Sequence, residues 1–148
     1  MKIILISVFV SISSLANMAF AQKDSMLKNY KWKNRIILVF TTDADGKEEQ
    51  QLSLFKEQSA GMEDRDLMFF RIKESKVIGP EDKSYPAYTA DQLRNKYRVQ
   101  QGEFTVILIG KDGTEKLRQH DILKTEKLFA TIDAMPMRQR EMRKGDGD

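Results

Sequence analysis

The sequence predicts an α/β domain built on a mixed four-stranded sheet that is flanked by helices on both faces. Three observations support this fold class. A continuous apolar run at 35–42 is followed by a helical pattern and then by a second apolar run at 66–73, which is the order of a parallel βαβ unit. A third apolar run enters a tight turn and leads to an alternating segment, which predicts an antiparallel hairpin. A final helical pattern closes the domain.

The first residues have the pattern of an export signal. Lys2 precedes an apolar stretch at 3–10, and Ala19-Phe20-Ala21 supplies a small-residue cleavage site. We therefore expect cleavage after Ala21, a mature domain at 22–144 and a disordered tail at 145–148, in a periplasmic or secreted protein. The apolar core of the signal is too short for a comfortable span of about 20 residues, so we expect no stable membrane span after cleavage.

Composition excludes several classes of function. The chain contains no cysteine, so thiol redox activity, disulfides and thiolate metal sites are excluded. The formal net charge is +3, and one less after loss of Lys2, which is too balanced to indicate nucleic acid binding. His120 is the only histidine. Copper ligation is a weaker explanation for Met135, Met137 and Met142 than packing, because methionine adapts to irregular gaps in the core and on the surface near a helix break. We therefore expect no metal ion and no other cofactor.

The segment before the first strand and the helix after it carry specific signals. Tyr30 and Trp32 are spaced to place both rings on one side of an extended chain, so we expect them to cover one end of the core. Asp45 and Glu48 fit a capping box. They predict the start of a helix that runs through about Gln58 and that Gly61 should end.

The middle of the chain predicts a long loop and a short helix. Residues 74–88 have no helical period and include two prolines and a glycine, which indicates a loop whose role the residues leave open. Thr89 and Gln92 fit a second capping box. Leu93 and Tyr97 lie on one face of the helix that follows and should be buried.

The hairpin and the last helix complete the domain. The first hairpin strand, at 104–109, is apolar on both faces, so it should lie inside the sheet. Gly113 should take the positive φ that the turn needs. The last helix should open near Thr125 and bury an apolar face that includes Ile132. Pro136 must either kink this helix or begin a new turn, because proline lacks the backbone N–H that a helix interior needs.

This order of elements is the layout of a thioredoxin-like fold, in which the second, first, third and fourth strands lie side by side in that order. In that fold the segment after the first strand holds the redox cysteines, and a cis-proline stands before the third strand. Here the first position is occupied by 41–47 without cysteine, and the second by Glu103 and Phe104. The fold therefore carries no redox prediction for this chain.

Several motifs resemble one known family. They are Lys31-Trp32-Lys33-Asn34-Arg35, Arg65-Asp66-Leu67, Leu93-Arg94, Leu108-Ile109-Gly110-Lys111-Asp112-Gly113 and Ile132-Asp133-Ala134-Met135-Pro136-Met137-Arg138. Together they resemble the domain-of-unknown-function family DUF4174, whose thioredoxin-like domain also occurs in animal extracellular proteins with sushi repeats and in matrix-associated coiled-coil proteins. The resemblance covers nearly the whole mature chain. It implies a thioredoxin-like fold and no assigned activity. A peroxiredoxin-like role has been supposed for the family, and its thiol version cannot apply without cysteine.

The leading functional hypothesis is an exported, non-catalytic thioredoxin-like module that binds another protein or a component of the cell envelope. The helix break at Pro136 should turn Met137 and Arg138 outward into the contact. Arg140 and Arg143 would form its rim. Arginine and methionine are both enriched at the cores of interfaces, which is why these residues are chosen. The oligomeric state stays open.

The alternative is a cysteine-independent enzyme of unknown reaction that uses aspartate and arginine side chains. Its candidate residues are Asp43, Asp112 or Asp133 together with Arg35 or Arg138. A closed cleft that gathers two carboxylates with perturbed pKa values would favour the enzyme. An open patch of arginine, methionine and aromatic side chains would favour binding.

Overall fold

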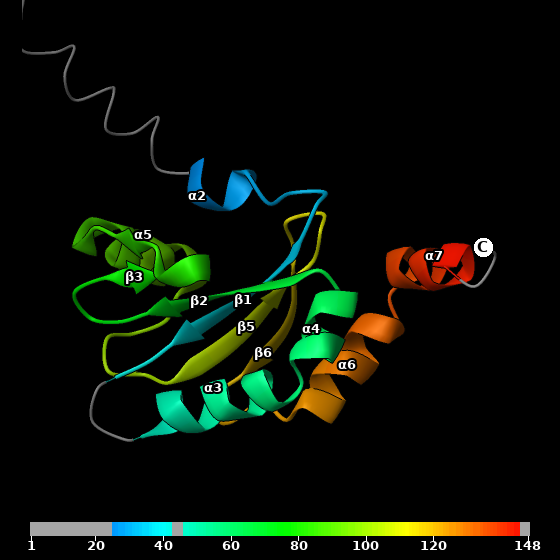
Figure 1. Cartoon of the computed structure of the whole chain (residues 1–148). Coiled ribbons are helices and arrows are strands. Elements are labelled where there is room, and N and C mark those ends of the chain that lie inside the picture. The colour runs from blue at the N-terminus through cyan, green and yellow to red at the C-terminus, as the bar shows by residue number, and fades with distance from the viewer. Residues whose placement is uncertain (1–24, 43–45, 146–148) are drawn as a thin grey trace, which may run out of the picture.

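The structure, a computed structural model, describes residues 25–42 and 46–145 of the chain. The expected signal at 1–21, the candidate residues Asp43 and Asp45, and most of the expected tail lie outside the described residues. In chain order the elements are α2 (Ser25–Lys28), β1 (Arg35–Phe40), α3 (Lys47–Glu57), α4 (Ser59–Asp64), β2 (Leu67–Ile72), β3 (Val77–Ile78), the 3-10 turn η2 (Pro80–Asp82), β4 (Ser84–Tyr85), α5 (Ala87–Tyr97), β5 (Thr105–Ile109), β6 (Glu115–Gln119), α6 (Thr125–Asp133) and α7 (Pro136–Gly145) (Figure 1).

One mixed sheet runs through the domain in the strand order β4-β3-β2-β1-β5-β6. β1 and β2 are parallel, and every other neighbouring pair is antiparallel. The predicted order of the four main strands is confirmed, but the sheet has six strands rather than four. The segment expected to be a loop at 74–88 contains β3 and β4, which extend the sheet beyond β2 and bury Val77. Gly79 permits this packing, since a Cβ there would lie 2.8 Å from the ring of Phe70.

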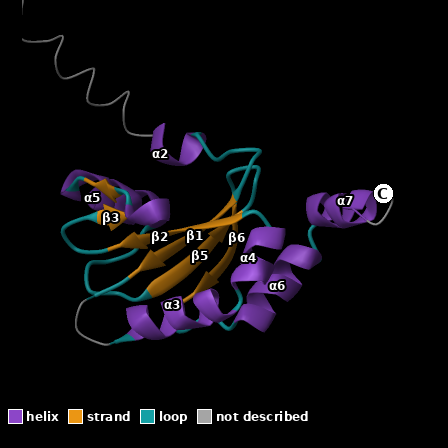
Figure 2. Ribbon diagram, viewed as in Figure 1, coloured by secondary structure: helices purple, strands orange, loops and turns teal. Residues whose placement is uncertain are grey.

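A hydrophobic core lies on each face of the sheet, which explains why every residue of β1 is buried. One core joins β1 to α5, where Leu93 and Tyr97 are buried as predicted. The other joins β1 to α3, α4 and α6, where Phe55 and Ile132 are buried. Figure 2 shows the helices on the two sides of the sheet.

The first long helix begins differently from its prediction, and it ends near Gln58 as predicted. α3 begins after Gly46, which is in the left-handed conformation and supplies no side-chain cap. The carboxylate of Glu48 is used elsewhere, because it lies 3.1 Å from the amine of Lys73 beyond β2. Gly61 does not end the helix. The break comes at Gln58, where φ is −112°, and Gly61 lies within α4.

A proline stands at the start of two later helices. α5 begins directly after Pro86, so the predicted capping box at Thr89 and Gln92 is wrong. α7 begins at Pro136 itself, so of the two alternatives for this proline the new helical turn is the one that occurs. Both outcomes follow from the fixed φ of proline, which suits the start of a helix where no backbone N–H donor is required.

The hairpin forms as predicted. β5 lies between β1 and β6. Gly113 has a φ of 83°, and its N–H donates to the carbonyl of Gly110 at 2.9 Å. Only glycine takes this backbone conformation without a steric penalty, so the turn fixes the register of the two strands.

The two aromatic residues before β1 differ in their packing. Tyr30 packs edge-on against Phe70, with ring centroids 5.4 Å apart. Trp32 is 63% exposed, so the prediction that it covers the core is wrong. Its backbone N–H donates to the carbonyl of Lys111 at 2.7 Å, and its φ is 66°. This left-handed backbone conformation directs the ring away from the core.

Candidate functional site

Arg138, the central residue of the predicted contact, is buried rather than exposed. Its side chain is 8% exposed and points to the end of α4. The guanidinium donates to the carbonyl of Asp64 at 2.8 Å, to the carboxylate of the same residue, and to Asp133 at 3.3 Å. The predicted exposure of Arg138 is therefore wrong, because α7 turns the residue back toward α4 and α6.

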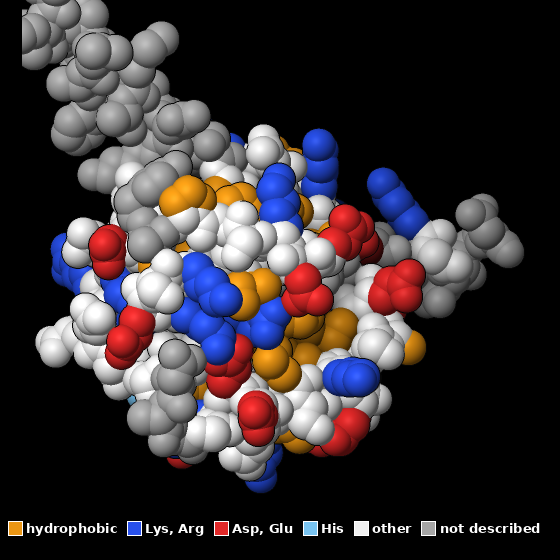
Figure 3. All heavy atoms as spheres, turned by 60° about the vertical axis from the view of Figure 1, so that its left-hand side comes forward, with side chains coloured by type: hydrophobic (Ala, Val, Ile, Leu, Met, Phe, Trp, Pro, Cys, Tyr) orange, Lys and Arg blue, Asp and Glu red, His pale blue; other side chains and the backbone are white. Residues whose placement is uncertain are grey.

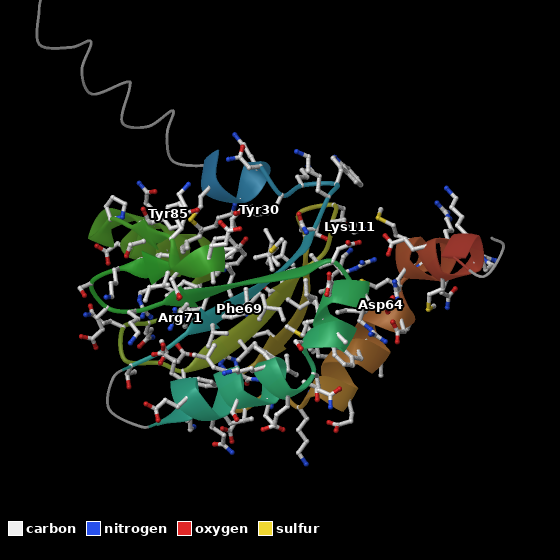
Figure 4. The ribbon with its side chains drawn as sticks, viewed as in Figure 1. Tyr30, Asp64, Phe69, Arg71, Tyr85 and Lys111 are labelled. Carbon is white, nitrogen blue, oxygen red and sulfur yellow. The ribbon has the colours of Figure 1, made fainter. Side chains whose placement is uncertain are left out.

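Arg138 belongs to a cluster of four cationic and four acidic side chains that we call the charged junction. Its members are Arg35, Asp64, Arg65, Asp66, Lys111, Asp133, Arg138 and Glu141. They come from the start of β1, the segment before β2, the β5–β6 turn and the two last helices. Figure 4 labels Asp64 and Lys111 at this end of the sheet.

Each charge in the junction meets at least one opposite charge. Arg65 donates to both carboxylate oxygens of Asp133, at 3.0 and 2.6 Å. Glu141 accepts from Arg35 at 3.1 Å and from Lys111 at 2.8 Å. The side chain of Arg35 is 1% exposed, so this contact ties α7 to the first strand of the sheet.

The ion pairs set the protonation of the junction carboxylates. Burial raises the pKa of Asp133, but the hydrogen bond and charge of Arg65, followed by those of Arg138, outweigh it and leave the pKa below its ordinary value. Burial likewise opposes ionisation of Glu141, and contacts with Lys111 and Arg35 lower its pKa overall. Both carboxylates are therefore ionised at neutral pH and already paired.

The residues of the alternative enzyme hypothesis fall into separate groups. Asp133, Arg35 and Arg138 lie in the charged junction, where their polar atoms bind one another. Asp112 lies in the β5–β6 turn, where it accepts from Thr114 and from Lys116 at 2.7 Å. Among 25–42 and 46–145, no group of three acidic, histidine or cysteine side chains could hold a metal ion.

An open apolar groove lies between β2 and the helices α3 and α4, and we call it the β2 groove. Its volume is about 740 Å³, and its apolar lining is Leu52, Phe55, Met62, Leu67, Met68 and Phe69. Phe69 is 36% exposed and faces Phe55, with ring centroids 6.2 Å apart. In the space-filling view, exposed hydrophobic side chains lie in a hollow between basic and acidic side chains (Figure 3). Within the described part of the chain, this hydrophobic surface stays open.

Charged side chains surround the β2 groove. Arg71 at its edge donates to Asp82 at 2.7 Å, and Figure 4 shows Arg71 and Phe69 along the same strand. Asp66 is paired with Lys111 of the junction. Lys56 and Glu63, from α3 and α4, have no ion pair or side-chain hydrogen bond within the described part of the chain. The helical rim therefore offers one positive and one negative group to a ligand.

The edge of β2 beside this groove is only partly used. β1 pairs with β2 over its whole length. β3 pairs only with Arg71 and Ile72, so residues 67–70 have no strand partner on that side among the described elements. Free strand edges of this kind accept an added strand from another chain.

The groove gathers arginine, methionine and aromatic side chains, the composition that we expected of a binding patch, although it is formed by other residues than those predicted. The sequence contains one signal for it. Phe69 and Phe70 are adjacent in β2, so they must point to opposite faces of the sheet. Phe70 is fully buried, whereas Phe69 remains partly exposed.

Thr41, at the start of the segment where the fold places redox cysteines, is held by polar contacts. Thr41 is buried, and its hydroxyl lies 3.4 Å from Glu48. Arg94 of α5 donates to the backbone carbonyls of Thr41 and Ile72, and burial lowers the pKa of Arg94. The side chain of His120 is largely exposed beside Glu103, at 2.9 Å. The two hydrogen bonds of Arg94 join the carboxyl ends of β1 and β2.

A family model described as Domain of unknown function (DUF4174) matches residues 26–141. The chain belongs to this family. The match extends from α2 into α7, so the charged junction and the β2 groove of this DUF4174 domain both lie within it. The family resemblance predicted from the sequence motifs is confirmed.

Solved structures of three malarial proteins share the fold of this DUF4174 domain. The reduced 2-Cys peroxiredoxin of Plasmodium vivax is 11% identical, with a TM-score of 0.58 over 77% of this chain and 84% of that chain. Thioredoxin peroxidase I of Plasmodium yoelii is 12% identical, with a TM-score of 0.58 over 77% and 79%. The mitochondrial 2-Cys peroxiredoxin of Plasmodium falciparum is 12% identical, with a TM-score of 0.56 over 73% and 79%. At these identities the likeness shows the fold alone, which is thioredoxin-like as predicted.

Proposed function

We propose that this chain is an exported, non-catalytic binding module whose β2 groove takes an extended, apolar segment of a partner protein. The proposal rests on one observation: a strand edge without a partner among the described elements and an open apolar groove lie side by side. Residues 67–70 offer a free strand edge, and the apolar groove lies directly beside that edge. An added strand would use both, because its backbone bonds the edge while alternate side chains enter the groove.

The chemistry of the groove defines the segment that it would accept. Apolar side chains two positions apart would pack against Phe55 and Phe69, since every second residue of a strand points to the same face. Lys56 and Glu63 on the helical rim would favour a segment that carries charges of both signs around its apolar residues. A segment with a single apolar residue would lose most of this contact.

Export is part of the proposal and rests on the signal pattern before residue 22. No helix of the described residues is long and apolar enough to cross a membrane. A partner in the cell envelope fits this location. The enzyme alternative lacks comparable support, because the carboxylates Asp133 and Glu141 of the charged junction are already paired with cations.

A library of extended peptides tests the proposal. The mature chain should select peptides with apolar residues at alternate positions, and binding should protect backbone amides of 67–70 from hydrogen exchange. The variant Phe69→Lys should weaken the selected peptides at least about tenfold, because it places a charge in the apolar groove. Trp32→Lys is the matched control, since it removes another exposed aromatic ring outside the groove. Selected peptides that bind Phe69→Lys as well as the wild type would refute the proposed site.

For three of the four residues after Pro136 that we expected to contact a partner, this contact remains a prediction. Met137, Arg140 and Arg143 do not line the β2 groove. Arg140 and Arg143 are exposed on α7. The double variant Arg140→Glu/Arg143→Glu tests whether they form part of the same interface. A loss of peptide affinity similar to that of Phe69→Lys would place them in it, and unchanged affinity would separate them from it.

A further inference from the structure

The strand edge beside the β2 groove is blocked at one end by the domain itself. Residues 67–70 have no strand partner on that side among the described elements, whereas Arg71 and Ile72 pair with β3. An added strand therefore cannot continue past residue 70 in the direction of β2, because β3 already occupies the next positions of the same edge. A partner segment that fills this edge must end, or turn away, at the blocked end.

An arginine side chain lies at the blocked end. Leu67, Phe69 and Arg71 alternate along β2 and so share one of its faces, and all three line the groove. In the view of Figure 4, Phe69 lies between Arg71 and Asp64. A segment whose apolar side chains contact Leu67 and Phe69 therefore brings its last position beside the guanidinium of Arg71.

The guanidinium of Arg71 keeps one donor without an acceptor. Its Nε is buried and has no hydrogen-bond partner in the described part of the chain. Its two terminal nitrogens lie 2.7 Å from Asp82 and 3.6 Å from Glu48. A buried donor without an acceptor destabilises a folded protein, so this atom in the wall of a groove indicates a polar ligand. A carboxylate suits an arginine best, because it accepts from two of the guanidinium nitrogens at once.

Asp82 is the side chain that such a carboxylate would replace. It lies in the turn between β3 and β4, its side chain is 88% exposed, and it accepts from Arg71 at 2.7 Å. Its φ of 55° follows a φ of 57° at Glu81, and non-glycine residues rarely adopt this conformation. An exposed ion pair is weak because water competes with it. A ligand carboxylate in the more sheltered groove can therefore take the place of Asp82.

We propose that the blocked end of the β2 groove binds the free carboxyl terminus of the partner segment, with Arg71 as the residue that recognises it. This inference rests on the proposed function and adds the chemistry of the ligand's end. The bound segment runs in the same direction as β2, because its carboxyl end lies beside Arg71 near the carboxyl end of that strand. Its earlier residues then lie near Glu63, so a basic residue there should add to the affinity.

A carboxyl terminus fits the blocked end better than the other sources of charge. An amino terminus would place a second positive charge beside Arg71. An acidic side chain inside a longer segment would offer a carboxylate, but its chain would have to turn away before β3. A terminal carboxylate ends the chain at the position where the edge ends.

Three forms of one peptide selected from the library test this inference. The mature chain should bind the free acid at least about tenfold more tightly than the same peptide with an amidated carboxyl end. The third form has glutamate as its last residue and an amidated end, so it offers a side-chain carboxylate only. It should bind like the amide. Fluorescence anisotropy of labelled peptides measures all three affinities.

Variants assign the preference to Arg71. Arg71→Gln should weaken the free acid far more than the amide, which reduces the preference to less than about threefold. Lys76→Gln is the matched control, because it removes one positive charge from the exposed turn between β2 and β3, outside the groove lining. It should keep the preference. Asp82→Asn removes the competing carboxylate and should strengthen binding of the free acid by roughly threefold.

Several outcomes would overturn the inference. Equal binding of the free acid and the amide to the wild type is decisive, even if Arg71→Gln does not fold. Equal binding of the glutamate form and the free acid would assign Arg71 to side-chain carboxylates. A similar loss of preference in Lys76→Gln would indicate a general attraction to positive charge. If the amide binds and Phe69→Lys weakens it, the groove stands and only the terminus is wrong, whereas absence of binding by every form would refute the proposed function as well.

Discussion

The charged junction and the β2 groove both adjoin α4, and they differ in how completely their groups are satisfied. In the junction, Asp64 and Arg65 at the end of α4 bind side chains of α6 and α7. In the groove, Met62 and Glu63 of the same helix line an open apolar surface. The first region holds elements of the domain together, and the second is open to a ligand. Dense charge therefore marks internal support here, whereas incomplete packing marks the candidate for binding.

The largest expected effect tests the internal role of the junction. Arg138→Glu places a third acidic group beside Asp64 and Asp133 and removes one of the two arginines that pair with them, so we expect a loss of about 3–5 kcal/mol in the free energy of unfolding. Arg140→Glu, two positions later on the exposed side of α7, should change it by less than about 0.5 kcal/mol. Urea unfolding of both variants measures the difference. Equal stability of the two would mean that the junction does not support the fold.

A second variant probes the packing of α4 on α6. Alanine normally stabilises a helix relative to glycine by up to about 1 kcal/mol. At Gly61, however, a Cβ would lie 2.7 Å from the ring of Phe129, which also stacks under the guanidinium of Arg65 at 4.2 Å. We therefore expect Gly61→Ala to destabilise the protein by about 1–2 kcal/mol in thermal or urea unfolding.

Two controls sharpen this prediction. Gly145→Ala meets no atom within 4 Å and should be nearly neutral. Phe129→Leu gives the new Cβ more room, so Gly61→Ala should cost less in that background than in the wild type. A cost that stays the same in both backgrounds would show that the ring is not the cause.

Acid should weaken the junction before it affects the groove. Asp133 and Glu141 have lowered pKa values in the folded protein, so they bind fewer protons there than in the unfolded chain. Their contribution to stability is complete above the unfolded values of about 4 and is lost as the pH falls through the lower folded values. Unfolding free energies of the wild type and of Asp133→Asn/Glu141→Gln, measured from about pH 7 to about pH 3, should differ in slope. The double variant should lose less stability on acidification, and parallel curves would contradict the predicted linkage.

Local sequence patterns predicted most of the fold because they report local forces. The apolar run of β1 predicts a strand buried on both faces. Gly113 predicts the hairpin turn in which it lies, because the turn needs a positive φ. β3 and β4 are only two residues long each, so they are too short to show the apolar alternation by which a strand is recognised in a sequence. Their pairing depends on β2, which precedes them in the chain.

The site could not be predicted in the same way because it depends on distant contacts. Arg138 is buried by Asp64, which lies 74 residues away in the chain. Nothing near Pro136 distinguishes an arginine that points inward from one that points to solvent. The β2 groove likewise arises where β3 stops pairing with β2, which the sequence around Phe69 does not record.

The smallest expected effect concerns two adjacent phenylalanines that lie on opposite faces of β2. Phe69→Ala removes a side chain that is 36% exposed and packs mainly against Phe55, so we expect a loss of about 1 kcal/mol in unfolding free energy. Phe70→Ala is the matched control, because the same change at a fully buried position should cost about 3–5 kcal/mol. Peptide affinity should show the reverse order, provided that Phe70→Ala is assayed where it remains folded. If Phe69→Ala instead costs as much as Phe70→Ala, then Phe69 belongs to the core and the β2 groove is part of the packing of the domain rather than a place for a partner.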